Sequence, residues 1–502
     1  MTSLSEASEE EPIAKLQAAE SSVFASRWEQ FTPYIAEFWG TLVITATFLC
    51  NVDGAGTDPV FKSISQAFMV IGIVSATKHI TGASLNPSVS LALALAGRQK
   101  LRTAGLLCVA QIAGGLTAAT LCFEAGVAKE LVLGPLKFHS WVQVGLLETL
   151  YASMLCLVYL NCAASTKNNP KGDQNGFIGL AVGCCYLASH NAAERICSTV
   201  SNSAVAIGLL VYGAGGIHLS HGVGYFLYDL LGAFLAAGIY RVLRPKEFVS
   251  LSRLNEDNTQ ESAVLGSEFI GTFYIVLTQV SSRLSGEKDL GPQAWGTAAA
   301  VIAMVCALRD VSGAHFNPAV TLAVRCSGRS PAEDMASDPK EVRYGIFYVI
   351  AQVLAGVAAS LIAGIVHASQ PRTSTVEAAT ASQICIAEGF GVFFLCYVVL
   401  ASSVTFPVDG SRSKQNNLAG VAYGSVILAV TLTVGNISGG MLNPVSVVSA
   451  IMVGAVSGRN SLLVDVTYHV VAAVAAAASF LVTHAQLYAK DALDADERLT
   501  GL

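Results

Sequence analysis

The stretch GAHFNPAVTLAVRCSGR, residues 313–329, repeats an earlier stretch of the same chain, GASLNPSVSLALALAGR at residues 82–98. SEFIGT at 267–272 repeats AEFWGT at 36–41, and both pairs are separated by 231 positions. Two matches at one offset indicate a duplicated unit rather than chance similarity. The chain therefore consists of two related halves.

Each half contains a further repeat, in which a glutamate within an apolar run precedes an asparagine by a nearly constant interval. The four intervals are 49, 54, 49 and 55 residues. The pairs are Glu37 with Asn86, Glu148 with Asn202, Glu268 with Asn317, and Glu388 with Asn443. The sequence therefore divides into four quarters of similar design.

The composition places these quarters in a membrane. Of the 502 residues, 53% are hydrophobic and 13% are charged, and the mean hydropathy is +0.55. A soluble protein carries about twice that charged fraction. Apolar runs of about 20 residues, the length of a helix that crosses the hydrocarbon core, recur along the chain. The sequence therefore predicts an all-α polytopic membrane protein.

Twelve membrane-crossing helices are expected, six in each half. Their predicted ranges are 32–51, 63–79, 103–124, 142–164, 176–193 and 222–243 in the first half, and 263–282, 294–309, 344–367, 382–405, 417–434 and 462–486 in the second. The asparagine-led segments have only about ten apolar residues, too few to cross, and are expected to be re-entrant half-helices with buried backbone. Three crossings per quarter reverse the orientation of successive quarters, so each half is an inverted repeat.

The domain organisation follows from these spans. We expect an N-terminal tail at 1–30, a first unit at 31–245, a polar linker at 246–261, a second unit at 262–488 and a C-terminal tail at 489–502. Because each unit has an even number of crossings, both tails and the linker lie on one side. That side carries 19 Lys and Arg residues against 8 on the other, with two unassigned. The excess predicts cytosolic termini, in the plasma membrane or an internal membrane.

Other classes of protein find little support. The net charge of −6 comes mostly from the tails and the linker and indicates no nucleic-acid partner. The twelve cysteines lie mainly in apolar segments without a CxxC pair, which favours small buried hydrophobes over metal ligands. No enzyme fingerprint stands in a fitting context, and no cofactor is expected.

The segment FNPAV at 316–320 shows what an asparagine-led half-helix can do. Asparagine is a favoured helix N-cap, and proline fits the first helical position. The amide NH₂ of Asn317 would then point outward from the positive end of a helix dipole. Two such ends meeting from opposite faces would let water or a hydroxyl pass by accepting hydrogen bonds, while cations would be repelled.

Two Asn-Pro-Ala-type motifs in every six spans, together with SGAHFNPAVT at 312–321, resemble the aquaporin, or major intrinsic protein, family over residues 30–245 and 262–488. The resemblance implies two channel units joined in one chain. The corresponding motifs are Asn86-Pro87-Ser88 with Asn202-Ser203-Ala204, and Asn317-Pro318-Ala319 with Asn443-Pro444-Val445. Ser203 stands in place of proline, and Val445 adds bulk where two half-helix tips should touch, which predicts altered geometry at the midpoint of the second unit.

The resemblance also assigns roles to other residues. The glutamates Glu37, Glu148, Glu268 and Glu388 are expected to hold loop backbone amides rather than to act in catalysis. Counting from the motifs gives two selectivity filters, Gln66, His190, Thr199 and Val205 in the first unit and Thr297, Thr431, Gly440 and Ser446 in the second. The family normally has arginine at the fourth position, and neither unit does. Val205 and Ser446 therefore predict wider mouths with a weaker barrier to cations.

These features predict passive transport of water or small neutral solutes, such as glycerol, urea, ammonia, hydrogen peroxide or a metalloid acid. The weaker second motif of the first unit leaves open that its pore does not conduct. Because the family forms tetramers of six-span subunits, a homodimer with pseudo-fourfold symmetry is expected. Two alternatives remain: a twelve-span secondary transporter, and a structural or junctional membrane protein with closed pores.

Overall fold

The computed structural model describes residues 28–53, 58–127, 133–136, 138–169, 176–193, 195–212, 219–248, 256–284, 289–328, 341–368, 379–403, 418–455 and 462–488. Most of the predicted N-terminal tail and the whole C-terminal tail, residues 489–502, lie outside these ranges, as does part of the linker. The described chain is helical apart from loops and one isolated bridge between Pro135 and Cys197. The all-α prediction is confirmed.

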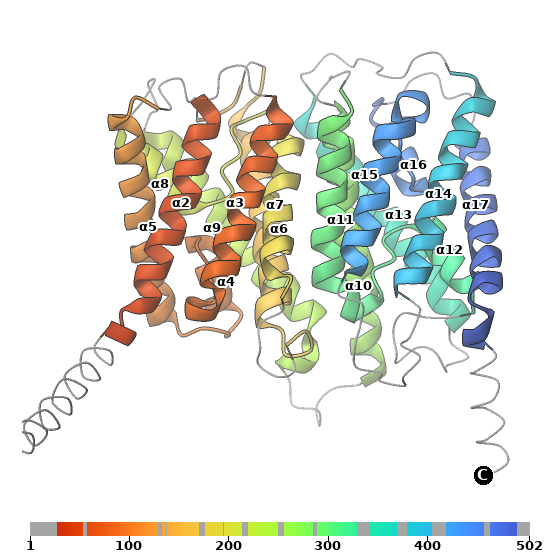
Figure 1. The fold of residues 1–502 in the computed structure, drawn as a ribbon, viewed down its shortest axis with the longest axis horizontal. Coiled ribbons are helices and arrows are strands. Elements are labelled where there is room, and N and C mark those ends of the chain that lie inside the picture. The colour runs from red at the N-terminus through yellow and green to blue at the C-terminus, as the bar shows by residue number, and fades with distance from the viewer. Residues whose placement is uncertain are drawn as a thin grey trace, which may run out of the picture.

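Each unit is built from six long helices that stand side by side (Figure 1). The first unit contains α2 (Thr32–Asp53), α3 (Pro59–Thr81), α5 (Leu101–Glu124), α6 (Trp141–Tyr159, continued by the π-helix η1, Leu160–Ala164), α7 (Ile178–Ala193) and α9 (Leu219–Leu243). The second contains α10 (Glu256–Leu284), α11 (Gly291–Ser312), α13 (Glu341–Val366), α14 (Ala381–Ser403), α15 (Ala419–Ser438) and α17 (Leu462–Thr483). A short 3₁₀ helix, η3 (Pro245–Glu247), follows α9.

Eleven of these helices are long and apolar enough to cross a membrane, each with at most two charged residues in its apolar core. The twelfth, α7, has 16 residues and lies in the first unit where α15 lies in the second. The ends of the helices match the predicted spans closely, with the largest difference at α10, which begins at Glu256 rather than 263. Helix α2 begins and α17 ends at the same side, the lower one in Figure 1.

Four short helices do not cross. They are α4 (Pro87–Leu95), α8 (Ser203–Tyr212), α12 (Pro318–Cys326) and α16 (Pro444–Met452). In Figure 1, α4 and α12 occupy the lower half of their units, and α8 and α16 the upper half. Each begins directly after one of the four asparagines, so the N-terminal ends of the half-helices meet in the middle of each unit.

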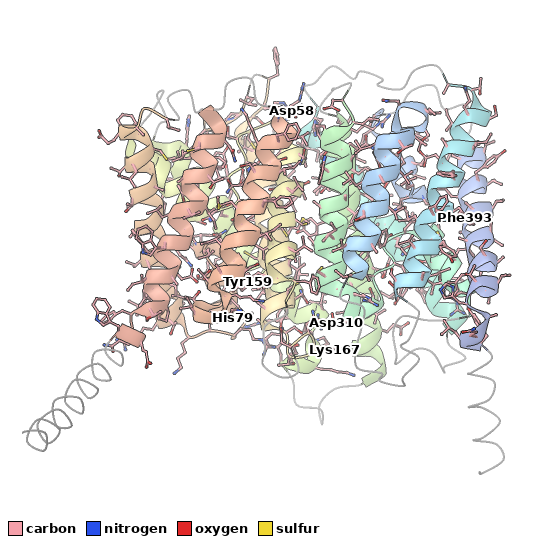
Figure 2. All side chains as sticks on the ribbon, in the orientation of Figure 1. Asp58, His79, Tyr159, Lys167, Asp310 and Phe393 are labelled. Carbon is pink, nitrogen blue, oxygen red and sulfur yellow. The ribbon has the colours of Figure 1, made fainter. Side chains whose placement is uncertain are left out.

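The two units pack against each other along α6 and α7 of the first and α10 and α11 of the second. The Tyr151 hydroxyl lies 3.0 Å from that of Thr278, and Ser153 forms a hydrogen bond with Tyr274 across the seam. At the lower edge, where Asp310 is labelled in Figure 2, the Asp310 carboxylate forms an ion pair with Arg244 at the end of α9. This seam mixes polar and small side chains, as is usual where helices associate within a membrane.

Candidate functional site

The two asparagine-capped half-helices of the first unit are joined by a pair of crossed hydrogen bonds. The Asn86 side chain caps α4 by accepting a hydrogen bond from the Ser88 N–H at 3.0 Å, and its Nδ2 donates to the Ser201 carbonyl at 2.9 Å. Asn202 caps α8 in the same way, accepting from the Ala204 N–H, and its Nδ2 donates to the Leu85 carbonyl at 3.0 Å. Each amide therefore closes its own helix and anchors the opposite loop.

The second unit repeats this arrangement. Asn317 Nδ2 donates to the Leu442 carbonyl at 2.9 Å, and Asn443 Nδ2 donates to the Phe316 carbonyl at 3.1 Å. The sequence suggested that the amide NH₂ groups point freely outward. In the structure, one N–H of each amide is instead bonded to the opposite loop. One N–H per amide remains for another acceptor.

The residue before each asparagine is held at both its amide and its carbonyl. Leu85, Ser201, Phe316 and Leu442 all have φ between 48° and 52°, a left-handed conformation that is uncommon for residues with side chains. Their carbonyls accept the crossed asparagine bonds, and their N–H groups donate to a buried glutamate. These contacts hold a strained backbone that would otherwise relax.

Each of the four glutamates accepts hydrogen bonds from two successive backbone amides of the loop beside it. Glu37 accepts from Ser84 and Leu85, Glu148 from Val200 and Ser201, Glu268 from His315 and Phe316, and Glu388 from Met441 and Leu442, over 2.7–3.2 Å. All four carboxylates are buried, at 0–1% exposure. Their oxygens therefore hold the loop backbone in place.

Asp229 and His469 occupy matching places in α9 and α17, and both make local contacts. The Asp229 carboxylate accepts a hydrogen bond from Ser203 at 3.3 Å. His469 Nδ1 lies 2.7 Å from the Asp465 carbonyl, and its Nε2 lies 3.4 Å from Glu388. The two units thus differ around the second glutamate of each: Glu148 of the first unit has the acid Asp229 in the helix that follows α8, and Glu388 of the second unit has His469 at the matching place.

Ser203, which replaces the proline of the motif, is part of a chain of side chains at the middle of the first unit. Its hydroxyl forms a hydrogen bond with Ser88, the third residue of the other motif, and a second with Asp229. All three residues are buried. The departures from the family pattern at 88 and 203 are therefore physically linked.

Val445 does not disturb the crossed bonds of the second unit, contrary to the expectation from its bulk. The two bonds measure 2.9 and 3.1 Å there, against 2.9 and 3.0 Å in the first unit. The valine side chain packs on Gly356 of α13, where an added Cβ would lie 2.0 Å from Val445 Cγ1. The missing side chain at 356 provides the space.

Three of the four predicted filter positions of the first unit line one cavity of about 210 Å³, which opens near the start of α3, on the upper side where Asp58 is labelled in Figure 2. These are Gln66, His190 and Thr199; Val205 is buried on α8 and is not among the lining residues. His190 Nδ1 lies 2.7 Å from the Tyr186 carbonyl and must carry the proton, which leaves Nε2 of the neutral ring as an acceptor. The cavity therefore presents two buried acceptors, His190 Nε2 and Gln66 Oε1, that have no partner among the described residues.

The predicted filter positions of the second unit are buried and tightly packed. Thr431 donates to the Gly440 carbonyl at 3.3 Å, and an added Cβ at Gly440, whose φ is +59°, would lie 2.9 Å from Thr431 Cα. Thr297 donates to the carbonyl of Gln293, one turn earlier on α11. Thr431 and Gly440 are thus brought into contact, whereas no hydrogen bond between described residues joins Thr297 or Ser446 to them.

Arg283, at the end of α10, lies beside this second filter and was missed in the sequence. Its guanidinium donates to the Gly439 carbonyl at 3.2 Å, to Gln293 Oε1 at 3.1 Å and to the Ala455 carbonyl at 3.3 Å. It is 4% exposed. Arg283 directly follows the predicted span 263–282, so the sequence suggests a charged residue at the membrane surface rather than a buried one. One feature of the sequence could have drawn attention to Arg283: the first unit has the apolar Val52 at the corresponding position, 231 residues earlier.

Tyr186 was also missed, because a tyrosine within an apolar run is usually a core residue. Its hydroxyl lies 3.4 Å from Asn202 Nδ2, at the point where the two half-helices of the first unit meet. Among the described residues, no group of three or more His, Cys, Asp or Glu side chains is placed to hold a metal ion.

The fold and the site define a class: a multi-pass helical membrane protein made of two six-helix units, each an inverted repeat with paired, asparagine-capped half-helices. The chain belongs to the major intrinsic protein family, whose sequence model matches residues 24–208, 280–383 and 375–498. Several matches within one chain agree with the duplication.

Several aquaporins are similar to this chain. Aquaporin NIP1-4 of Oryza sativa subsp. japonica is 31% identical over 199 residues, which cover 38% of this chain and 66% of the rice protein. Aquaporin NIP1-1 of Zea mays is 32% identical over 223 residues, covering 42% of this chain and 71% of the maize protein. Aquaporin Z of Rhodopseudomonas palustris is 27% identical over 226 residues, covering 42% of this chain and 93% of the bacterial protein. Each match therefore corresponds to about one of the two units.

Proposed function

We propose that the protein is a membrane channel that conducts water or small neutral solutes passively. The observation that carries this proposal is the pair of crossed asparagines in each unit, where two half-helices meet N-terminus to N-terminus. The partial positive charges of two helix ends repel cations, while the remaining amide N–H groups can donate to a passing oxygen. The aquaporin names of the relatives agree with this function.

The class of permeant is inferred from the residues at the two predicted filters. Neither predicted filter has an arginine, and the second has no aromatic residue: Gln66, His190, Thr199 and Val205 form the first, and Thr297, Thr431, Gly440 and Ser446 the second. The acceptors of the first cavity, His190 Nε2 and Gln66 Oε1, favour molecules that donate hydrogen bonds. Water, ammonia, urea, glycerol, hydrogen peroxide and metalloid acids all do so.

Arg283 supplies the second unit with a fixed positive charge close to its filter, although from another helix than in the family pattern. Its guanidinium is bonded to Gly439, the residue before the filter position Gly440. A buried positive charge at a channel mouth raises the energy of a cation that approaches. We therefore expect the second unit to exclude cations despite Ser446.

The assembly we propose is a homodimer with four units around one axis. In the spans that form the internal seam, 72–78% of the residues are buried for α6, α10 and α11. Their counterparts in the repeat, α14, α2 and α3, are only 39–50% buried. At the internal seam, α6 and α7 pack against α10 and α11. If α2 and α3 of one chain packed against α14 and α15 of a second chain, these exposed helices would make the same contact as their repeat counterparts make at the internal seam.

The test is stopped-flow flux into proteoliposomes with water, glycerol, urea, ammonia and peroxide, using the wild-type chain and the single variants Asn202→Asp and Asn443→Asp. A carboxylate removes the amide donor and adds negative charge where the two half-helices meet. We expect flux that is linear in the gradient and that falls when the asparagine of a conducting unit is replaced; flux that neither variant changes would refute the channel. Saturable flux driven by an ion gradient would favour a secondary transporter, and no flux of any solute would favour a structural protein with closed pores.

The orientation is also proposed. Both termini are expected on the cytosolic side because that side carries more Lys and Arg. Protease protection of a C-terminal tag in sealed vesicles tests this assignment.

A further inference from the structure

Tyr186 lies between a residue that lines the cavity of the first unit, His190, and the asparagine Asn202. It is one helical turn before His190 on α7, and the two ring centroids are 6.3 Å apart. His190 lines the cavity, so Tyr186 is the next side chain on the way from the cavity to the asparagines. Its side chain is 3% exposed.

The hydroxyl of Tyr186 occupies the hydrogen-bonding position that a permeating molecule needs. One N–H of the Asn202 amide donates to Leu85, and the other is directed to Tyr186 Oη at 3.4 Å. A separation of 3.4 Å leaves no room for a water molecule, which needs about 2.8 Å to each partner.

The second unit differs at this level. Sixteen residues before the second asparagine, where the first unit has Tyr186, the second has Ile427. Among the described residues, Asn443 Nδ2 has one acceptor, the Phe316 carbonyl, and Asn443 is 6% exposed whereas Asn202 is 0% exposed. A tyrosine of α15, Tyr423, lies one turn earlier, where it donates to the His315 carbonyl at 3.0 Å.

We propose that Tyr186 is the barrier that closes the first unit at its paired asparagines, and that the second unit, which has Ile427 at this place, is not closed at this level. The inference rests on the proposed channel function. The phenol ring fills the route below the cavity, and its hydroxyl takes the amide donor that would otherwise bind the permeant. The cavity lined by Gln66 and His190 is then open near the start of α3 and ends at Tyr186.

The test measures water flux into proteoliposomes for a reciprocal pair of variants. Tyr186→Ile gives the first unit the residue of the second, and Ile427→Tyr does the reverse. Opening one further pore per chain should raise flux about twofold, and Ile427→Tyr should reduce it to nearly the level of empty liposomes. In the Asn443→Asp background, Tyr186→Ile should restore roughly the wild-type flux.

Tyr186→Phe is the matched control, because it keeps the ring and removes only the hydroxyl. It should give a smaller gain than Tyr186→Ile, because the amide donor is freed while the ring still fills the route. Equal gains from phenylalanine and isoleucine would indicate loosened packing rather than removal of the ring, and would overturn the proposal. If gel filtration shows that Tyr186→Ile does not fold, the proposal is tested with Ile427→Tyr alone. Unchanged flux in Ile427→Tyr would overturn the proposal.

The outcomes separate this inference from the channel function. Wild-type flux that Asn443→Asp abolishes, with no gain from Tyr186→Ile, would refute the barrier and leave the channel intact. No flux from wild type or from either variant would refute both.

Discussion

The hydroxyls of Ser88 and Ser203 form a hydrogen bond at the centre of the first unit, joining the two motifs that approach from opposite faces. The corresponding residues of the second unit are Ala319 and Pro444, which have no hydroxyl. Asp229 accepts a further hydrogen bond from Ser203 in the buried interior. A polar link thus stands in the first unit where the second has apolar packing.

We predict that Ser88 and Ser203 stabilise the fold cooperatively. Ser88→Ala and Ser203→Ala should each lower the thermal unfolding midpoint in detergent, since each removes a partner from a buried hydroxyl. The coupling energy should be about 0.6 kcal/mol, typical of hydrogen bonds between membrane helices. In a double-mutant cycle, the two single losses should together exceed the loss in the double variant. Strictly additive losses would contradict the link.

The sequence predicted the parts of the structure that repeat. Four asparagines in matching register predicted four half-helices, because an N-cap and an apolar run too short to cross a membrane leave few other structures. The sequence could not show the contacts of Tyr186 and Arg283. The repeat has a different residue at each of these positions, Ile427 for Tyr186 and Val52 for Arg283, and each side chain acts through a neighbour on another segment, Asn202 or Gly439. Only the packing of several helices brings them together.

Gly356 should be intolerant of a side chain because of Val445. A Cβ at 356 would lie 2.0 Å from Val445 Cγ1 and 3.0 Å from Ser449 Oγ, so Gly356→Ala should destabilise the second unit by about 1–3 kcal/mol. Adding Val445→Ala should recover most of that loss. Gly72→Ala is the control, because nothing lies within 4 Å of its Cβ position. The thermal midpoint reports all three, and a lack of rescue by Val445→Ala would place the clash elsewhere.

Arg283 should control cation exclusion in the second unit. Arg283→Gln keeps hydrogen-bond donors but removes the charge, and we expect it to raise proton leak roughly ten- to a hundredfold, the effect of losing about 1–3 kcal/mol of electrostatic barrier. Arg283→Lys keeps the charge and should leak less. The control is Arg102→Gln, which removes an exposed arginine of the first unit. A pH-sensitive dye inside the liposomes measures the leak, and equal values for Arg283→Gln and wild type would exclude Arg283 as the barrier.

The proposed dimer predicts a specific cross-link. At the internal seam, an added Cβ at Gly296 would lie 3.0 Å from Asn191 Cβ, so α11 and α7 approach closely there. The repeat relates Gly296 to Ser65 and Asn191 to Leu432, and both of these residues are exposed. Ser65→Cys with Leu432→Cys in one chain should therefore form a disulfide-linked dimer on oxidation in membranes.

Each single cysteine variant is the control for this cross-link, since the native cysteines Cys50 and Cys326 are also exposed. Val109, which is 66% exposed on α5, lies outside the proposed contact, so pairing Val109→Cys with Leu432→Cys should give no more dimer than the single variants. The yield of the Ser65–Leu432 pair should also not fall when the protein is diluted with lipid, because the dimer forms before oxidation. A yield that falls with dilution would indicate random collision and would contradict the four-unit assembly.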